Sequence, residues 1–219
     1  HETADTMKFY PAYLDLRDRP CLVVGGGSVA ERKALSLLGA GADVTVVSLS
    51  LTPKLRELSD SGKITHLQKK FEENDLSSEF LVVAATDSPD VNRQAAQACK
   101  KRHILVNVAV PPEESTFIVP SVVERGELLI AVSTSGTSPA LSKKIRQELE
   151  ERYGPEYGLF LDKVSGIRKR VMEENADEQK RRRIFQAIVD SDAIELLRQG
   201  KAHEAEVRMI ELAGLKHKI

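Results

Sequence analysis

The 219-residue sequence predicts an α/β fold in which a Rossmann-type parallel sheet is followed by a region with short strands and an all-helical C-terminal domain. Three observations support this prediction. Apolar strand-like runs alternate with helical patterns through the first half, which is typical of a parallel sheet covered by helices on both sides. A glycine-rich turn directly follows the first of these runs. From about residue 159 onward, apolar residues recur only at helical spacing.

The first half of the chain contains five predicted strands. One run is rich in β-branched residues, and the run at 80–85 is apolar throughout, as expected of a strand buried on both faces. Gly39 and Gly41 end the first helix, on which Leu35 and Leu38 share one face. In chain order, the predicted strands lie at 22–24, 43–47, 64–67, 80–85 and 104–109, and the helices lie at 29–38, from 55 after Pro53, and at 91–101.

The pattern changes at the Pro-Pro pair that begins at Pro111. Two strand-like runs follow, at 116–119 and 128–132, and are joined across a Glu-Arg-Gly-Glu turn. A helix then begins with Ser138 as its N-cap and Pro139 in its first turn, which is a strong start signal. The apolar stripes expected along this helix and the later ones are Leu141, Ile145 and Leu149; Leu159, Val164, Ile167 and Val171; Ile184, Phe185, Ile188 and Val189; and Val207, Ile210 and Leu212.

Composition narrows the class of protein. The 32 basic and 33 acidic residues give a net charge of -1, which argues against nucleic acid or an anionic membrane as the main partner. No apolar run approaches the roughly 20 residues that span a bilayer. Cys21 and Cys99 lack C-x-x-C spacing, so we expect both in the core of a reduced, cytoplasmic protein. The five histidines form no ligand-spaced pair, so we expect no metal site.

The glycine-rich turn is the first candidate site. Gly25, Gly27 and Ala30 fit the G-x-G-x-x-G/A pattern of a dinucleotide-binding strand–turn–helix unit. The first glycine permits the tight turn, the second lets a pyrophosphate approach the backbone, and the alanine keeps the helix close to the strand. The N-terminus of the helix offers free N–H groups to the phosphates. The alternative is a purely structural glycine turn.

Two further loops belong to this candidate site. The second strand is followed by Ser48 and Ser50, where many NAD-binding units carry an acidic residue that binds the ribose. Lys54 and Arg56 are near enough in sequence to bind a 2′-phosphate, so NADP stays open as an alternative to NAD. At the carboxyl end of the fourth strand, the loop 84–87 leaves the sheet where ligands of open α/β folds bind.

The second candidate site lies between the last predicted strand and the helix that Ser138 begins. Gly136, Thr137 and Ser138 are expected to present backbone N–H groups and hydroxyls to a carboxylate or phosphate. The alternative is an ordinary capped helix start. A basic run at 180–183 is either a solvated helix face or a set of arginine donors for an acidic ligand.

In this order, these pieces resemble the precorrin-2 dehydrogenase/sirohydrochlorin ferrochelatase family, which also forms the N-terminal half of siroheme synthases. Phe-Ile-Val-Pro-Ser at 117–121 and Gly-Thr-Ser-Pro at 136–139 are far more specific than the glycine turn. The methyltransferase domain of the fused enzymes is absent, so the chain resembles the stand-alone form. The other matching stretches are 16–19, 21–33, 84–87, 91–92, 107–108, 131–133 and 181–183.

The resemblance implies NAD-dependent oxidation of precorrin-2 to sirohydrochlorin by a homodimer, followed in some members by insertion of Fe²⁺. It implies an NAD-binding domain at 7–112, a dimerisation and active-site region at 113–153, and a helical domain at 154–219. The loop 136–138 would then help bind the tetrapyrrole. The residues expected around NAD are Gly25, Gly27, Ser28, Val29, Ser48, Leu49, Ser50, Thr86 and Asp87.

One position departs from the family. An aspartate proposed to transfer protons is common where this chain has Val110, and valine can neither accept a proton nor bind a metal. Losing a general base typically costs about 10²–10⁴-fold in rate, so metal insertion is more doubtful than oxidation. Glu113, Glu114 and Asp87 are the nearest substitutes, although the two glutamates also suit a solvated loop. Thr134 keeps the hydroxyl of a family serine close to the proposed active site, so the resemblance makes it a candidate catalytic residue together with Glu113 and Glu114.

Three functions therefore follow as hypotheses. The first is an NAD-dependent precorrin-2 dehydrogenase. The second is a bifunctional dehydrogenase and sirohydrochlorin ferrochelatase that uses a substitute base. The third is a nucleotide-sensing domain without turnover, which would leave the Gly-Thr-Ser-Pro motif at 136–139 unexplained.

Overall fold

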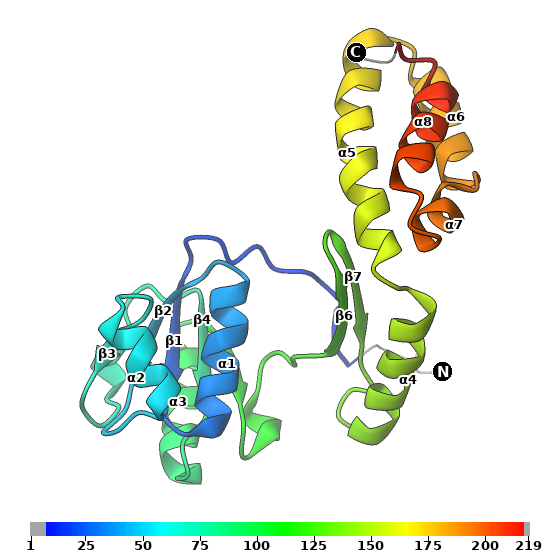
Figure 1. Ribbon diagram of the computed structural model, residues 1–219. Coiled ribbons are helices and arrows are strands. Elements are labelled where there is room, and N and C mark those ends of the chain that lie inside the picture. Colours follow the sequence, from blue (N-terminus) through cyan, green and yellow to red (C-terminus); the bar gives the residue numbers. More distant parts are fainter. Residues whose placement is uncertain (1–7, 217–219) are drawn as a thin grey trace, which may run out of the picture. The chain divides into compact units, whose positions relative to one another are not determined.

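The structure, a computed structural model, describes residues 8–216. The chain divides into two compact units, one extending to Val119 and the other beginning at Pro120 (Figure 1). The three expected domains stay a prediction, and their outermost residues, Met7 and Ile219, lie outside the described part of the chain.

A parallel sheet of five strands forms the centre of the first unit. Its strands are β1 (Pro20–Val24), β2 (Asp43–Val47), β3 (Thr65–Leu67), β4 (Leu81–Ala84) and β5 (Leu105–Val108). Their order in the sheet is β3-β2-β1-β4-β5, with β1 paired in parallel to β2 on one side and to β4 on the other. The strand order therefore reverses between β1 and β4, which is where open α/β sheets bind ligands. The predicted parallel α/β fold is confirmed.

Three helices cover this sheet: α1 (Ser28–Gly39), α2 (Pro53–Asp60) and α3 (Pro89–Lys101). The last two begin alike, with a hydroxyl residue followed by proline. Thr52 Oγ1 accepts a hydrogen bond from Leu55 N at 3.2 Å, and Ser88 Oγ accepts one from Val91 N at 3.4 Å. Each cap satisfies a backbone donor that the first turn leaves free.

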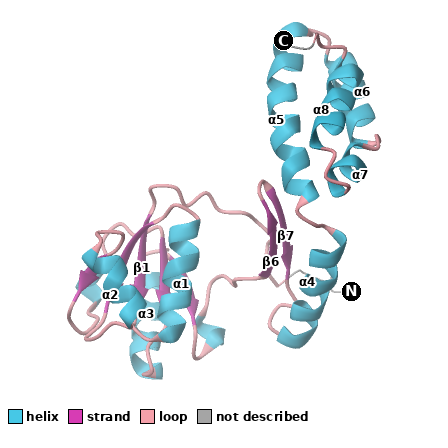
Figure 2. Cartoon of the chain, in the orientation of Figure 1, coloured by secondary structure: helices cyan, strands magenta, loops and turns pink. Residues whose placement is uncertain are grey.

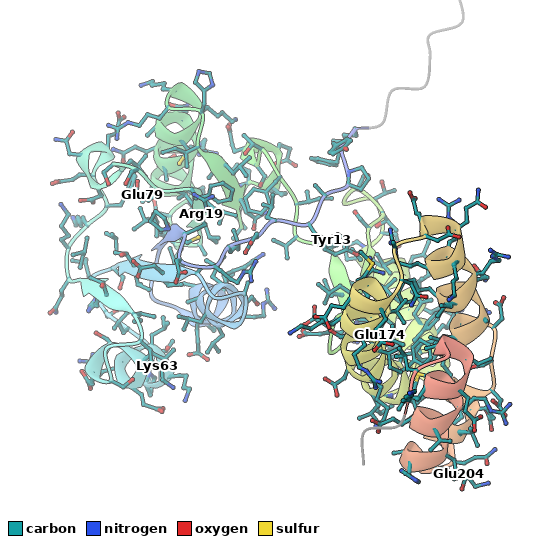
Figure 3. The ribbon with its side chains drawn as sticks, turned by 90° about the horizontal axis from the view of Figure 1, so that it is seen from above. Tyr13, Arg19, Lys63, Glu79, Glu174 and Glu204 are labelled. Carbon is teal, nitrogen blue, oxygen red and sulfur yellow. The ribbon has the colours of Figure 1, made fainter. Side chains whose placement is uncertain are left out.

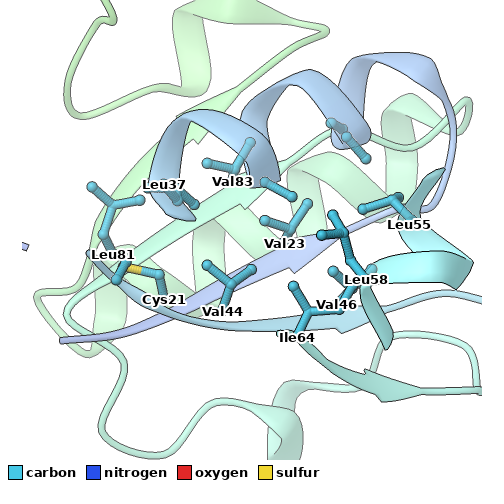
Figure 4. Packing of buried hydrophobic residues seen from close by; sticks show 14 of the residues in the cluster. Cys21, Val23, Leu37, Val44, Val46, Leu55, Leu58, Ile64, Leu81 and Val83 are labelled. Atoms are coloured by element: carbon cyan, nitrogen blue, oxygen red, sulfur yellow. The ribbon is translucent and has the colours of Figure 1, made fainter. Parts of the chain in front are cut away.

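The core of this unit has two layers, one on each face of the sheet. Alternate strand residues such as Cys21 and Val23 pack with α1 and α2, and Figure 4 shows this cluster. The intervening residues, such as Leu22 and Val24, pack with α3 on the opposite face. Cys99 lies in that second cluster and, like Cys21, is a buried free thiol, as predicted.

The buried face of α1 differs from the prediction. Leu35 is 39% exposed, whereas Leu37 is buried together with Ala30 and Ala34. The two alanines, four residues apart, let the helix approach the sheet closely, so they define the inner stripe. Leu38 is partly buried beside that stripe.

The predicted strand at 116–119 is wrong. The segment instead covers the outer edge of β5 through a mixture of main-chain and hydroxyl contacts. Thr116 N donates to Val106 O, Val106 N donates to Thr116 Oγ1, and Val108 N donates to Ser115 Oγ, each at 2.8 Å. Because hydroxyls replace the main-chain acceptors of a further strand, the ladder does not continue.

The second unit begins with an antiparallel hairpin, β6 (Ser121–Arg125) and β7 (Leu128–Val132), whose turn uses Gly126 at φ 58°. Helix α4 (Pro139–Arg152) follows, and Ser138 Oγ caps it by accepting from Leu141 N at 3.3 Å, as predicted. The remaining helices are α5 (Glu156–Glu174), α6 (Glu178–Val189), α7 (Ala193–Arg198) and α8 (Ala202–Ala213), shown in Figure 2.

The C-terminal helices of this unit pack around their own core. Ile167, Val171, Ile184 and Ile188 face it as predicted. Leu159 does not, because the neighbouring Phe160 takes the inward position. Val189 and Leu212 are likewise exposed, whereas Met209 and Ile210 are buried.

Most charged side chains lie on the outside of both units, although Glu156 is buried. Lys63, Glu174 and Glu204 are exposed examples that Figure 3 labels. The Arg19 guanidinium lies over the Phe80 ring, 5.5 Å from its centroid. Within residues 8–216, no helix combines the length and apolar character needed to cross a bilayer.

Candidate functional site

A pocket of about 740 Å³ opens at the carboxyl ends of β1, β2 and β4. This is the crevice that the strand order predicts. It brings together three segments that the sequence singled out separately: the glycine turn, the loop after β2 and the loop after β4. Its lining consists of Val24, Gly25, Gly26, Gly27, Val47, Ser48, Leu49, Ser50, Leu51, Thr52, Lys69, Lys70, Phe71, Ala85, Thr86, Asp87, Ser88, Val91 and Gln94.

The three glycines of the turn face different surroundings. A Cβ on Gly25, which has φ 122°, would lie 2.3 Å from Ala85 O, so only glycine fits there. A Cβ on Gly26 would lie 1.9 Å from Ser50 O, so this position also requires glycine, although it lies outside the predicted G-x-G-x-x-G/A glycines. A Cβ on Gly27 would meet no atom within 4 Å. The space beside Gly27 is therefore open.

The N-terminus of α1 points to the same open space. Gly27 is its N-cap residue, and no side chain caps the first turn. Ser28 and Val29 form that turn next to the residues that line the pocket. Free N–H groups, the positive end of the helix dipole and open space at a glycine fit a pyrophosphate. These residues therefore fit the dinucleotide that the turn predicts.

On the β2 side of the pocket, Ser48 is held by the neighbouring strand. Its N–H donates to Leu67 O at 3.2 Å, and the Nε2 atom of His66 lies 3.1 Å from Ser48 O and 3.2 Å from Ser48 Oγ. Leu49 and Ser50 follow and are exposed. Hydroxyls and main-chain groups thus occupy the position where an acidic residue often binds the ribose.

On the β4 side, the buried Asn92 holds two loops together. Its Oδ1 atom accepts from Thr86 N at 3.0 Å and from Thr86 Oγ1 at 2.8 Å. Its Nδ2 atom donates to Thr86 O at 3.1 Å and to Val110 O at 2.9 Å. Position 110 is therefore fixed beside the loop that carries Asp87. The Val110 side chain itself is 56% exposed.

The two glutamates proposed as substitute bases do not line the pocket. Glu114 forms an ion pair with Lys100 at 2.5 Å, and Glu113 is exposed in the short 3-10 turn Pro112–Glu114. Asp87 is the one carboxylate among the described residues that line the pocket. Of the three substitutes, it is the one that the fold brings to the dinucleotide site.

A half-buried lysine on α1, Lys33, was not predicted from the sequence. Lys33 Nζ on α1 donates to Asn107 Oδ1 at 3.0 Å, and Asn107 Nδ2 donates to Phe117 O at 3.2 Å. Burial, assisted by the nearby Arg32, lowers the pKa of Lys33. The contact joins α1, β5 and the segment that leaves the sheet. The only sequence signal for Lys33 is that it directly precedes Ala34, a residue of the buried stripe of α1.

In the second unit, the predicted substrate loop is largely self-contained. Thr137 N donates to Thr134 O at 2.9 Å, and Ser138 N donates to Thr134 Oγ1 at 3.1 Å. The expectation that both N–H groups are presented to a ligand is therefore wrong. Thr134 Oγ1 also donates to Ser138 O at 3.0 Å, so its proton is engaged within the loop. Gly136, at φ 86°, keeps its N–H outside these bonds.

The basic run lies on α6 in the same unit. Arg181 donates to the carbonyl oxygens of Asn175 and Ala176 at 2.8 Å and thereby caps the end of α5. Arg182 and Arg183 are exposed. The run therefore contains one structural arginine and two arginines on a solvated face.

Family models match almost the whole described chain. Residues 12–121 match a domain described as putative NAD(P)-binding, residues 125–152 match the central part of sirohaem biosynthesis proteins, and residues 156–212 match the dimerisation region of sirohaem synthase. Among solved structures, SirC, a precorrin-2 dehydrogenase, is 30% identical with a TM-score of 0.78, and the match covers 93% of this chain and all of that one. The chain belongs to the precorrin-2 dehydrogenase and siroheme synthase family.

Curated siroheme synthases extend this family relationship. The chain is 41% identical over 199 residues to the enzyme of Thioalkalivibrio sulfidiphilus, and 38% identical over 188 residues to that of Escherichia coli O157:H7. These matches cover 91% and 86% of this chain but only 41% of either relative. The chain thus spans less than half the length of these curated relatives. The predictions of family, fold and an NAD-type cofactor are confirmed.

Proposed function

We propose that this chain oxidises precorrin-2 to sirohydrochlorin with NAD⁺ during siroheme synthesis. The observation that carries the proposal is the open, uncapped N-terminus of α1 beside Gly27, in a chain that continues into the central and dimerisation segments of sirohaem proteins. A dinucleotide site alone supports many oxidoreductases. Its combination with these segments favours a tetrapyrrole substrate.

Bound NAD⁺ supplies the hydride acceptor for this oxidation. The protein's task is then to hold the dinucleotide and to place the substrate carbon against it. Gly25 and Gly27 would let the pyrophosphate approach the backbone, and the first turn of α1 would donate N–H groups to it. The loop at Thr86 and Asp87 would flank the nicotinamide end, because it follows β4 on the other side of the turn from Ser48.

The oxidation also releases a proton, and Val110 cannot take it. We assign this role to Asp87, the carboxylate that lines the pocket on the β4 side. Asn92 supports this arrangement, because it fixes the preceding Thr86 through three hydrogen bonds. Glu113 and Glu114 lie outside the pocket lining and are weaker candidates.

We propose in addition that the chain acts as a homodimer in the cytoplasm. The match to a dimerisation region supports the dimer, as do exposed apolar residues of the second unit, such as Leu141 at 48% and Leu159 at 52% exposure. The two buried, unpaired thiols suit a reducing compartment. Sedimentation equilibrium tests the dimer, and a single species of monomer mass across micromolar concentrations would contradict it.

The activity is tested by anaerobic incubation with precorrin-2 and NAD⁺. We expect NADH and the absorption spectrum of sirohydrochlorin to develop together. If NAD⁺ binds tightly but neither product forms and no tetrapyrrole binds, the chain is a nucleotide-sensing domain. An Asp87→Asn variant is expected to bind NAD⁺ normally and to lose about 10²–10⁴-fold in turnover.

A further inference from the structure

The β2 side of the dinucleotide pocket is rich in hydrogen-bond donors. The segment that follows β3 brings Lys69 and Lys70 to the pocket beside Ser48 and Ser50. β3 pairs in parallel with β2, so both strands end at the same edge, with Val47 opposite Leu67. Lys54 and Arg56, which are near this side in sequence, do not line this pocket.

The two lysines differ in their partners. Lys69 Nζ is neutralised by Asp75 at 2.8 Å and by Glu72 at 3.0 Å. Lys70 is exposed, and within residues 8–216 no carboxylate lies within salt-bridge distance of its ammonium group. Lys70 therefore brings an ammonium group without an ion-pair partner to this side of the pocket, although its charge and those of Lys69, Glu72 and Asp75 sum to zero. No acidic residue of the pocket opposes it there, because Asp87 follows β4.

The hydroxyl of Ser48 adds a neutral donor. Since a carbonyl oxygen can only accept, the contact between His66 Nε2 and Ser48 O assigns a proton to Nε2. Ser48 Oγ, 3.2 Å from the same nitrogen, then accepts from it. The hydroxyl proton of Ser48 is left to be donated to a ligand. The hydroxyls of a ribose diol donate hydrogen bonds, so a carboxylate acceptor binds them best. A phosphate oxygen only accepts, so it is bound best by donors such as this hydroxyl and the Lys70 ammonium group.

We propose that Ser48 and Lys70 form a 2′-phosphate subsite, so that this chain binds NADP⁺ as well as NAD⁺. Three observations on the β2 side of the pocket support this proposal. Among the described residues, Lys70 has no ion-pair partner, the hydroxyl of Ser48 is available as a donor, and no carboxylate lines this side. The inference rests on the dinucleotide site. It does not depend on precorrin-2 being the substrate.

The test is a direct binding titration by calorimetry with NAD⁺ and NADP⁺, without any tetrapyrrole. For the native chain we expect dissociation constants within about tenfold of each other. Lys70→Met is expected to weaken NADP⁺ binding by about tenfold or more and to leave NAD⁺ binding unchanged, because a charge-assisted hydrogen bond is lost only with the phosphate. Ser48→Asp is expected to weaken NADP⁺ binding further, because its carboxylate would repel the 2′-phosphate.

Lys54→Met is the matched control. This lysine is also exposed, but it pairs with Glu57 at 2.9 Å and does not line the pocket. We expect it to change neither affinity. Native NADP⁺ binding about 100-fold weaker than NAD⁺ binding would overturn the proposal, as would equal losses for both nucleotides in Lys70→Met. NADP⁺ binding without precorrin-2 oxidation would support the subsite and contradict only the proposed activity.

Discussion

Asn92 Nδ2 donates a hydrogen bond to the carbonyl oxygen of Val110 at 2.9 Å. The same buried amide makes three further hydrogen bonds to Thr86. One side chain thus joins the loop that lines the dinucleotide pocket to position 110, where the sequence resemblance leads us to expect an aspartate and this chain has valine. The contact fixes where a side chain at position 110 would lie, whatever its chemistry.

Replacing this amide tests its role in holding the two loops. Asn92→Ala leaves buried polar groups of the Thr86 and Val110 loops without a partner, so we expect about 2–3 kcal/mol lower free energy of unfolding in urea. NAD⁺ binding should weaken as well. The exposed neighbour Arg93 provides the control, because Arg93→Ala is expected to change stability by no more than about 0.5 kcal/mol. Equal effects of the two variants would contradict this account.

Two substitutions in the glycine turn distinguish an effect on NAD⁺ affinity from an effect on the free energy of unfolding. Gly27→Ala places a methyl group in open space, so the free energy of unfolding should stay nearly unchanged while NAD⁺ affinity falls by about tenfold or more. Gly25→Ala forces a contact with Ala85 O and an unfavourable φ, so it should reduce stability itself. Calorimetric titration and urea unfolding measure both effects. Undiminished NAD⁺ binding by Gly27→Ala would place the pyrophosphate elsewhere.

The loop before α4 contains a strained backbone conformation, and we expect a substitution that relieves it to raise the free energy of unfolding. Ser135 has φ 53°, a left-handed conformation that costs a non-glycine residue about 1–2 kcal/mol. Glycine removes this cost but loses about 0.5–1 kcal/mol in conformational entropy, so Ser135→Gly should raise the free energy of unfolding by about 0.5–1 kcal/mol. Ser133→Gly, at a neighbouring position without positive φ, should not stabilise.

The two buried thiols predict a loss of stability in alkali. Burial raises the pKa of Cys21 to about 11 and that of Cys99 to about 12, from 9.0. Above pH 9 the unfolded chain releases thiol protons that the folded chain still holds, so stability falls as pH rises from about 9 toward 11. Urea unfolding of native protein and Cys99→Ala across this range measures the slope. An identical slope would contradict the role of Cys99.

The valine at position 110 leads to a prediction about metal insertion. Supplied with sirohydrochlorin and Fe²⁺ or Co²⁺, the native chain should insert metal no faster than the uncatalysed reaction, because insertion displaces two N–H protons and Val110 provides no base in addition to Asp87. Val110→Asp should insert metal, with a gain of about 10²–10⁴-fold over native. The chain would then be a dehydrogenase without chelatase activity. Rapid insertion by the native chain would show that a substitute base serves instead.

The features that were predicted best are those that depend on residues close together in the sequence. The turn at Gly25, the strands that precede the pocket loops and the cap at Ser138 all follow from local patterns, and the structure confirms them. The prediction of a strand at 116–119 was wrong because the hydroxyls of Thr116 and Ser115 bond to β5, in contacts across ten and seven positions of sequence. Apolar spacing cannot reveal such a contact.

The residues of the candidate site were likewise predicted where the signal is local in sequence and missed where it depends on contacts between distant residues. Ser48 and Thr86 were found because each follows a strand. Lys69 and Lys70 were missed because their place beside Ser48 depends on the pairing of β2 with β3. Thr134 was predicted as a catalytic hydroxyl, yet whether its proton is free depends on how the loop closes on Ser138. The catalytic roles themselves stay predictions.

The most direct measurement of the central claim is a single turnover with enzyme in excess over precorrin-2, under anaerobic conditions with NAD⁺. We predict that NADH and sirohydrochlorin form in equal amounts and at one rate, and that Gly27→Ala slows both equally. Consumption of precorrin-2 without NADH, or NADH without sirohydrochlorin, would contradict the account.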